Sequence, residues 1–142
     1  MGSYVAVTGQ LWGVPLSIIR IYTPPPLTVS LLEVISRLIS QLPVGKLIIG
    51  GDMNGVIDIC LDQCTQRGTS PPNLTLLAKF NSAMGLADVW RSMHPTPGGY
   101  TCYSGQNGTY SRLDYLFLPQ ADMADILKAE VLAHRISGFY DT

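Results

Sequence analysis

Alternation between apolar and turn-forming residues in the first part of the chain predicts two paired strands. Residues 4–11 and 14–22 alternate or run in β-branched and aromatic side chains, and Trp12-Gly13 between them favours a tight hairpin turn. The consecutive prolines Pro24–Pro26 follow the second run and forbid its continuation as a strand. We therefore expect Tyr22 to lie at a strand end.

A helix and a buried strand are predicted next. Ser30 and Glu33 have the spacing of a capping box, and apolar residues then recur every three or four positions, which predicts a helix over 29–42. Residues 46–51 follow as an apolar run of the kind that forms a strand covered on both faces. This strand–helix–strand order predicts a layered α/β domain with functional loops at strand ends.

Weaker patterns predict the rest of the fold. Residues 55–72 are rich in turn formers and predict a long surface loop, after which Asn73 is expected to cap a helix that Gly85 ends. The segment after Gly85 is expected to carry Trp90 into the core. The remaining expectations are a strand at 100–104, a hairpin turn at 106–109, a strand at 111–118, a helical segment at 122–127 and a final strand at 129–135.

Composition narrows the class of protein. The chain has 142 residues, enough for one domain, and 46% of them are hydrophobic while 13% are charged. This apolar balance suits a sheet buried on both faces or a domain that lacks a partner surface. A formal net charge of −1 gives no global field for attracting nucleic acid, so any phosphate contact must be local.

Cysteine usage and hydropathy indicate an intracellular protein. Cys60, Cys64 and Cys102 lack the spacing of a zinc site, so we expect them to be small reduced residues of the core. No secretory signal opens the sequence, and no apolar stretch reaches the roughly 18 residues that a membrane span needs. We therefore expect no membrane partner.

The strongest candidate chemistry lies where the buried strand ends. Gly50 and Gly51 remove side chains at a place where a backbone or a phosphate must come close, and Asp52 and Asn54 follow two positions apart. Shared strand parity would let both polar side chains face one cleft. The same residues also make an ordinary turn, and the local sequence leaves both interpretations open.

Histidines and tyrosines are weaker candidates. His94 and His134 are interpreted as structural or solvent-facing. Four tyrosines could stack on bases if exposed, although aromatic residues in hairpins more often form core or cross-strand pairs. These tyrosines are Tyr100, Tyr103, Tyr110 and Tyr115.

Two other segments, together with the strand end at Asp52, match known sequence motifs in a characteristic order along the chain. Tyr22-Thr23-Pro24 resembles the motif Tyr-x-Pro-Asn, Gly51–Asn54 resembles Gly-Asp-x-Asn, and Ser111–Tyr115 resembles Ser-Arg-Ile-Asp. Together they resemble the endonuclease/exonuclease/phosphatase family that includes DNase I, and most of all the endonuclease domains of LINE-type non-LTR retrotransposons. The segments around Asp62 and from Asp88 to His94 are similar to the retroelement members in particular.

This resemblance implies a fold and a reaction. The implied fold is an incomplete DNase I-like four-layer α/β sandwich, in which two mixed or antiparallel sheets pack together between helices. The implied reaction is divalent-metal-dependent cleavage of a nucleic-acid phosphodiester, with DNA as the partner. Asp52 would accept a proton from the attacking water, Asn54 would hold that water or a phosphate oxygen, and Tyr22 would bring a phenol to the phosphate. Asp114 would either orient the catalytic His of the family or lie beside the metal.

Two further residue roles concern charge. The resemblance implies that Asp52 and Asn54 hold Mg²⁺ or Mn²⁺ weakly, because other family ligands are missing. Arg112 would either bridge to a phosphate or lock neighbouring carboxylates, and the structural bridge is favoured, since a strand-borne arginine near acids commonly pairs with them.

The sequence departs from the family pattern at both ends. Family members begin with an Asn-bearing strand and a metal-binding Glu that have no counterpart here, and they carry Ser-Asp-His where this sequence reads Ser137-Gly138-Phe139. Pro25 also replaces the usual Asn of the tyrosine motif. We therefore expect residues 1–142 to be a partial domain with impaired catalysis.

Three functions follow from these patterns. The first is a retroelement-type DNA endonuclease fragment. The second is a catalytically dead remnant that acts as a binding module, which the departures favour. The third and weaker one is a phosphatase of small phosphoesters or lipids, because the same fold can host that reaction. The apolar composition also predicts self-association or a missing domain segment.

Overall fold

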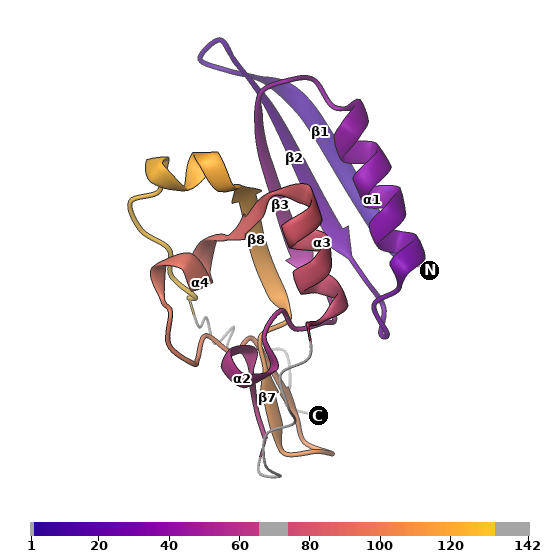
Figure 1. Ribbon diagram of the computed structural model, residues 1–142, viewed down its shortest axis with the longest axis vertical. Coiled ribbons are helices and arrows are strands. Elements are labelled where there is room, and N and C mark those ends of the chain that lie inside the picture. Colours follow the sequence, from indigo (N-terminus) through magenta and orange to yellow (C-terminus); the bar gives the residue numbers. More distant parts are fainter. Residues whose placement is uncertain (1, 66–73, 133–142) are drawn as a thin grey trace, which may run out of the picture.

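The computed structural model describes residues 2–65 and 74–132 (Figure 1). Within these ranges the chain forms a five-stranded sheet and a separate three-stranded sheet. In chain order the elements are β1 (Ser3–Leu11), β2 (Val14–Tyr22), α1 (Val29–Gln41), β3 (Lys46–Asp52), α2 (Ile59–Asp62), β4 (Gln63–Cys64), α3 (Leu76–Met84), β5 (Leu86–Asp88), α4 (Val89–Met93), β6 (Cys102–Ser104), β7 (Thr109–Ser111), β8 (Asp114–Pro119) and the 3-10 helix η1 (Gln120–Asp125).

The larger sheet is mixed, with the strand order β1-β2-β3-β8-β5. Strands β2 and β3 are parallel and are joined through α1, whereas the pairs β1–β2, β3–β8 and β5–β8 are antiparallel. The crossover through α1 brings the carboxyl ends of β2 and β3 to one edge of the sheet. Because β8 runs the opposite way, it begins at that same edge.

The predicted hairpin at the start of the chain is confirmed. Strands β1 and β2 pair antiparallel over their full lengths, from Ser3 opposite Tyr22 to Leu11 opposite Val14. Trp12 and Gly13 in the turn have φ angles of 48° and 78°. Two consecutive positive φ angles fit the right-handed twist of the strands on either side.

Helices α1 and α3 form where they were predicted, but their caps differ. Thr28, with an extended backbone, caps α1 by accepting a hydrogen bond from the Leu31 amide, so the predicted Ser30 cap is wrong. Thr75 caps α3 through the Ala78 amide, whereas the predicted cap Asn73 lies outside the described residues. Gly85 ends α3 in the left-handed conformation, as predicted.

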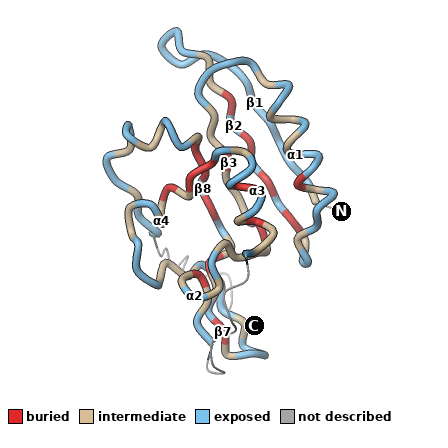
Figure 2. The backbone as a smooth tube through the Cα atoms, in the orientation of Figure 1, coloured by how far each residue is buried: buried red, intermediate tan, exposed pale blue. Residues whose placement is uncertain are grey.

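The core lies between the larger sheet and these two helices. Ile49 on β3 and Phe117 on β8 are register neighbours and are both fully buried. They pack with the inward faces of the helices, Leu32 and Ile35 on α1 and Leu77 and Phe80 on α3 among them. Figure 2 shows this burial along the middle strands, while β1 is exposed along its whole length.

The other face of the larger sheet carries exposed apolar side chains. On β2, Ile19 and Ile21 are 0% and 1% exposed, whereas the alternate residue Ile18 is 43% exposed. Val7, the register neighbour of Ile18 on β1, is 61% exposed. We call the face that carries Val7 and Ile18 the open face.

The predicted strand 111–118 is interrupted. Strand β7 ends at Ser111 and β8 begins at Asp114, and the two belong to different sheets. The backbone amide of Arg112 donates to the carbonyl oxygen of Asp62 at 2.8 Å, and the carbonyl oxygen of Leu113 accepts from the Met53 amide at 2.9 Å. These two hydrogen bonds hold the chain as it passes from one sheet to the other.

Other local predictions are corrected. The expected loop at 55–72 contains the short helix α2, which Asp58 caps. Trp90 is only half-buried, because the neighbouring Val89 takes the core position at 2% exposure. The helical segment expected at 122–127 forms slightly earlier, as η1. Of the strand expected at 129–135, residues 129–132 have no regular structure and 133–135 lie outside the described ranges.

The cysteines are exposed, so their predicted place in the core is wrong. Cys64 and Cys102 belong to β4 and β6 of the three-stranded sheet, and Cys60 belongs to α2. A sheet of such short strands covers little of its own surface, which leaves small side chains accessible. Among the residues that the structure describes, no helix combines the length and apolar character needed to span a bilayer.

Gly51 provides a test of the central strand pairing. A Cβ atom at Gly51 would lie 1.8 Å from the carbonyl oxygen of Ile21, and the residue has a φ of 140°. We expect Gly51→Ala to lower the free energy of unfolding by about 2–4 kcal/mol, through overpacking and backbone strain. Urea denaturation measures this effect. The matched change Gly9→Ala meets no atom within 4 Å and should leave stability nearly unchanged, and equal effects of the two changes would contradict the interpretation.

Candidate functional site

Three of the predicted site residues lie side by side at one edge of the larger sheet. Tyr22 at the end of β2 is the register neighbour of Asp52 at the end of β3, and Asp52 is the register neighbour of Asp114 at the start of β8. Residues in register on adjacent strands project from the same face of a sheet. The structure thus brings together a phenol and two carboxylates on the open face.

We call Tyr22, Asp52 and Asp114 the row. The row is accessible from solvent. Tyr22 is 39% exposed, Asp52 is half-buried, and Asp114 is exposed. Behind it, the backbone is tightly held, because the amide of the fully buried Thr23 donates to the carbonyl oxygen of Asp52 at 2.9 Å. An exposed row on a fixed backbone can meet a substrate without first reorganising the sheet.

Asn54 belongs to the turn that follows β3. Its backbone has a φ of 42°, its amide donates to Oδ1 of Asp52 at 2.9 Å, and its Nδ2 donates to the carbonyl oxygen of Thr23. The expected strand parity with Asp52 is wrong, because β3 ends at Asp52. Asp52 and Asn54 therefore form a turn, the second of the two interpretations of the sequence. The hydrogen bond from the Asn54 amide fixes one oxygen of the Asp52 carboxylate.

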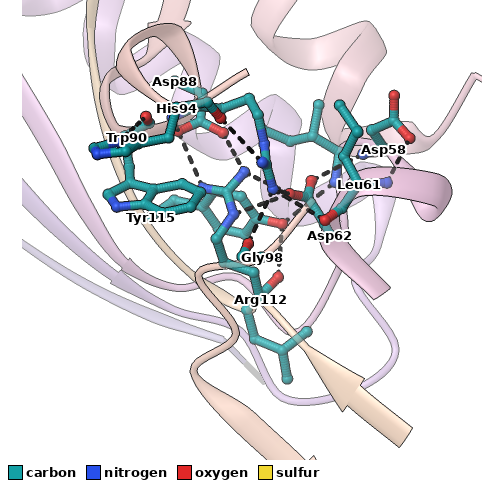
Figure 3. Close-up of polar contacts among 12 residues, drawn as sticks. Asp58, Leu61, Asp62, Asp88, Trp90, His94, Gly98, Arg112 and Tyr115 are labelled. Atoms are coloured by element: carbon teal, nitrogen blue, oxygen red, sulfur yellow. Dashed lines mark hydrogen bonds and ion pairs between the residues drawn. The ribbon is translucent and has the colours of Figure 1, made fainter. Parts of the chain in front are cut away.

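Arg112 is buried and bridges two acids (Figure 3). Its Nε and Nη2 donate to Oδ1 of Asp62 at 2.9 and 2.7 Å, and its Nη1 donates to Oδ1 of Asp88 at 3.1 Å. Its Nη2 also donates to Oδ2 of Asp88. Arg112 therefore has the structural bridging arrangement that the sequence favoured. The alternative contact with a phosphate does not fit a side chain that is 1% exposed.

A second arginine completes this cluster. Arg91 Nη2 donates to the same Oδ1 of Asp62 at 2.6 Å, and its guanidinium also donates to backbone carbonyl oxygens, those of Leu61, His94, Thr96 and Gly98. Asp62 accepts from the Asp58 amide through Oδ2 at 3.0 Å. We call the set Asp62, Asp88, Arg91 and Arg112 the ion cluster. Its two acids and two bases balance, so its formal charge is neutral.

Aromatic rings lie against the ion cluster. The guanidinium carbon of Arg112 is 4.5 Å from the ring centroid of Tyr115 and 5.4 Å from that of Trp90. The Tyr115 hydroxyl donates to the carbonyl oxygen of Arg112 at 2.7 Å. These contacts pack the cationic side chain against ring faces and hold its backbone.

Burial and charge shift two pKa values in the cluster. Burial alone would lower the pKa of Arg112, but hydrogen bonds and charge from Asp88 and then Asp62 outweigh it and raise the pKa. Burial raises the pKa of the Tyr115 phenol well above its ordinary value, and the negative charge of Asp62 acts in the same direction. Both groups therefore stay protonated throughout the physiological range.

The sequence did not identify Asp62, Asp88 and Arg91 as partners of Arg112. Their segments were distinguished only by their similarity to retroelement sequences. No local pattern could have identified these partners, because the pairs of Arg112 with Asp62 and Asp88 join positions 50 and 24 residues apart in the chain. His94 takes the expected structural role, because its ring stacks on Trp90 at 4.5 Å. His134 lies outside the described residues.

The hairpin tyrosines are both paired and exposed. Tyr103 on β6 and Tyr110 on β7 are register neighbours, with ring centroids 4.6 Å apart, and they are 57% and 50% exposed. Thr101, just before β6, accepts hydrogen bonds from the amides of Leu113 and Asp114 at 3.1 and 3.2 Å. The tyrosine-bearing hairpin is therefore anchored beside the site row.

The row offers two carboxylates to a divalent cation but does not form a complete metal site. Within residues 2–65 and 74–132, no group of three or more His, Cys, Asp or Glu side chains is arranged to hold a metal. Asp52 and Asp114 nevertheless supply two neighbouring carboxylates, and Mg²⁺ is often bound by one or two carboxylates together with water. Asn54, the other predicted ligand, gives its Nδ2 to Thr23, so only its Oδ1 could reach a metal.

Solved structures share this architecture. The endonuclease domain of TRAS1, a telomere-specific non-LTR retrotransposon, aligns with a TM-score of 0.58 and 19% identity over 83% of this chain and 49% of its own. A humanized D. rerio TDP2 with 14 mutations aligns with a TM-score of 0.52 and 16% identity over 84% of this chain and 46% of its own. No protein-family model matches the sequence.

These likenesses confirm the predicted DNase I-like mixed α/β fold. The chain spans about half the length of each of these two proteins. At this level of identity the comparison is one of fold, so the roles of individual residues in the row stay predictions.

The ion cluster predicts a large effect of removing Arg112. Arg112→Met leaves Asp62, which is 1% exposed, and Asp88 without their shared donor, and we expect the free energy of unfolding to fall by about 3–5 kcal/mol. Urea denaturation measures the loss. Neutralising the acids as well, by Asp62→Asn and Asp88→Asn, should recover part of the loss.

The matched control for Arg112 is an exposed ion pair. Lys46 donates to Asp122 at 2.6 Å on the surface, and Lys46→Met removes a cation of similar length without leaving a buried charge. Its urea midpoint should stay near that of the parent protein. Equal losses from Arg112→Met and Lys46→Met would show that the ion cluster has no special role.

Tyr115 predicts an alkaline loss of stability. Because burial raises its pKa, the unfolded chain releases the phenolic proton at a lower pH than the folded chain does. The stabilising contribution is complete below about pH 10, the ordinary tyrosine pKa, and is lost as the pH rises above it. Tyr115→Phe should lower stability near pH 7 by about 1–3 kcal/mol, by leaving a buried carbonyl unpaired. It should also show a shallower loss between pH 9 and pH 11 in urea titrations, and parallel curves for both proteins would contradict this assignment.

Proposed function

We propose that this protein is a divalent-metal-dependent phosphodiesterase of the endonuclease type, which nicks DNA slowly. The observation that carries the proposal is the in-register row of Tyr22, Asp52 and Asp114 at an exposed sheet edge. A phenol and two carboxylates supply a hydrogen-bond donor, a proton acceptor and cation ligands on adjacent strands. Metal-dependent hydrolysis of a phosphodiester can use all three.

Asp52 is the best candidate for the proton acceptor. The Asn54 amide fixes its Oδ1, and among the described residues nothing donates to its Oδ2, which is therefore available to an attacking water. Tyr22, at 39% exposure, would donate its phenolic hydrogen to a phosphate oxygen. A bound divalent cation would neutralise charge on the phosphate, and Asp52 and Asp114 are the residues that would hold it.

DNA is favoured over a small phosphoester by the surroundings of the row. The row lies on an open edge, and the exposed Tyr103–Tyr110 pair is anchored beside it through Thr101. Exposed aromatic rings on a hairpin whose base is bonded to the Asp114 backbone suit a polymer whose bases can stack on them. The likeness to the TRAS1 endonuclease domain adds support for this substrate class.

A second candidate function is DNA binding without cleavage. Asn54, which the family resemblance places among the catalytic residues, donates its side-chain amide to Thr23 and serves the turn. Gly138 and Phe139 stand where the resemblance implies an acid and an imidazole, and both lie outside the described residues. If the protein is a phosphodiesterase, these features account for slow cleavage. If it is a DNA-binding protein, they account for the absence of cleavage.

Nicking of supercoiled plasmid in Mg²⁺ tests the proposal. We expect slow conversion to the open-circular form, abolished by EDTA and reduced at least about 100-fold by Asp52→Asn, because that change removes the proton acceptor while keeping the shape of the side chain. Asp114→Asn should weaken the dependence on Mg²⁺. The double change Gly138→Asp with Phe139→His should increase the rate.

The matched control is Asp125→Asn. This acid is 72% exposed on η1, and Asp122 still pairs with Lys46 when it is neutralised, so nicking should be unchanged. Nicking that survives Asp52→Asn would reject the proposed site. Binding of a labelled duplex without nicking would establish the second candidate, and absence of both activities would reject a nucleic-acid function.

A further inference from the structure

Arg20 lies on the open face next to the candidate site. It precedes Tyr22 by two positions on β2, between the buried residues Ile19 and Ile21. Alternation along a strand therefore puts Arg20 and Tyr22 on the same face. The register neighbours of Arg20 are Val5 on β1 and Gly50 on β3.

The surroundings leave room for this side chain to move toward the row. Gly50 has no side chain, and Val5 is 58% exposed, so neither neighbour encloses the guanidinium. Two residues along a strand correspond to about 7 Å, a distance that the long arginine side chain can span. Arg20 is itself exposed.

Most other basic side chains in the described ranges are already paired or lie elsewhere. Arg91 and Arg112 belong to the ion cluster, Lys46 pairs with Asp122 and Asp125, and Lys128 pairs with Glu130. The two helical cations, Arg37 on α1 and Lys79 on α3, belong to the helices that cover the opposite face. Among the residues that the structure describes, Arg20 is thus the basic residue of the open face that has no carboxylate partner.

The charge of the row makes such a cation useful. Asp52 and Asp114 are both acidic and would repel a polyanion as it approaches the edge of the sheet. The net charge of −1 supplies no general attraction that could offset this repulsion. A guanidinium can offer two parallel hydrogen bonds to a phosphate, a geometry that a mobile counterion lacks.

We propose that Arg20 binds a backbone phosphate of the DNA strand that lies across the row of Tyr22, Asp52 and Asp114. It contacts a phosphate next to the one under attack and so positions the strand, while the row performs the reaction. This inference rests on the proposed function and adds a substrate-positioning residue to it. A solvated arginine that only keeps the apolar open face soluble is the competing explanation.

Salt-dependent binding of DNA separates these explanations. We suggest measuring fluorescence anisotropy of a labelled DNA duplex in EDTA, so that no cleavage occurs, over a series of salt concentrations. Arg20→Gln should weaken binding about tenfold at low salt and reduce the slope of log K against log salt by about 0.9, the value for one lost phosphate contact. Arg20→Lys should keep the slope while recovering only part of the affinity, because lysine keeps the charge but not the fork.

The control is Arg37→Gln, which removes the same charge from α1 on the opposite face. It should bind like the parent protein in both affinity and slope. Equal slopes for Arg20→Gln and Arg37→Gln, with clear binding by the parent, would overturn the role of Arg20 and leave the proposed function intact. If the parent protein neither binds the duplex at any salt concentration nor nicks plasmid in Mg²⁺, the proposed function fails and the role of Arg20 fails with it.

Folding of the variants is checked by urea denaturation. Arg20 and Arg37 are both exposed, so all three changes should leave the midpoint close to that of the parent. If Arg20→Gln proves unstable, the comparison of Arg20→Lys with the parent still decides the matter. In that case a lysine variant with unchanged affinity would overturn the need for the guanidinium fork.

Discussion

The bridge from Arg112 to Asp62 and Asp88 is the interaction on which the geometry of this protein depends. It lies at the point where the chain leaves the three-stranded sheet and enters the five-stranded one, two residues before Asp114. A buried arginine is tolerated only where acids compensate its charge and hydrogen bonds satisfy its donors. The need to satisfy this one side chain therefore fixes α2, β5 and the junction between the sheets relative to one another.

This arrangement also holds the backbone of the candidate site in place. Leu113 accepts a hydrogen bond from Met53, immediately after Asp52, and Thr101 holds the amide of Asp114. The turn after β3 and the junction before β8 are thus tied to each other, with Thr23 tied to the first of them. Acids that must cooperate at one phosphate are held by backbone hydrogen bonds rather than by long flexible loops.

Local patterns predicted much of the fold, and long-range pairing explains what they missed. The hairpin at Trp12-Gly13, the helix after Thr28 and the end of α3 at Gly85 depend on neighbouring residues and were visible in the sequence. The interruption at Arg112 was not, because its cause lies in Asp62 and Asp88, which an unaligned sequence does not pair with it. Tyr22 and Asp52 could be expected at one edge from their strand ends, whereas the side chain of Asn54 is committed to a turn that strand parity cannot describe.

The pairing of β3 with β8 also bears on when the site can exist during synthesis. Asp52 meets Asp114 only after the whole stretch 53–113 has been made and its ends have closed on each other. Closing a long loop costs entropy that is recovered only when the strands pair, so such contacts form late in folding. On the ribosome, a chain that has emerged only as far as α3 holds Tyr22 and Asp52 but has no second acid. Any hydrolytic capacity would therefore arise in one step, when β8 pairs with β3 after β1, β2 and β3 are already in place.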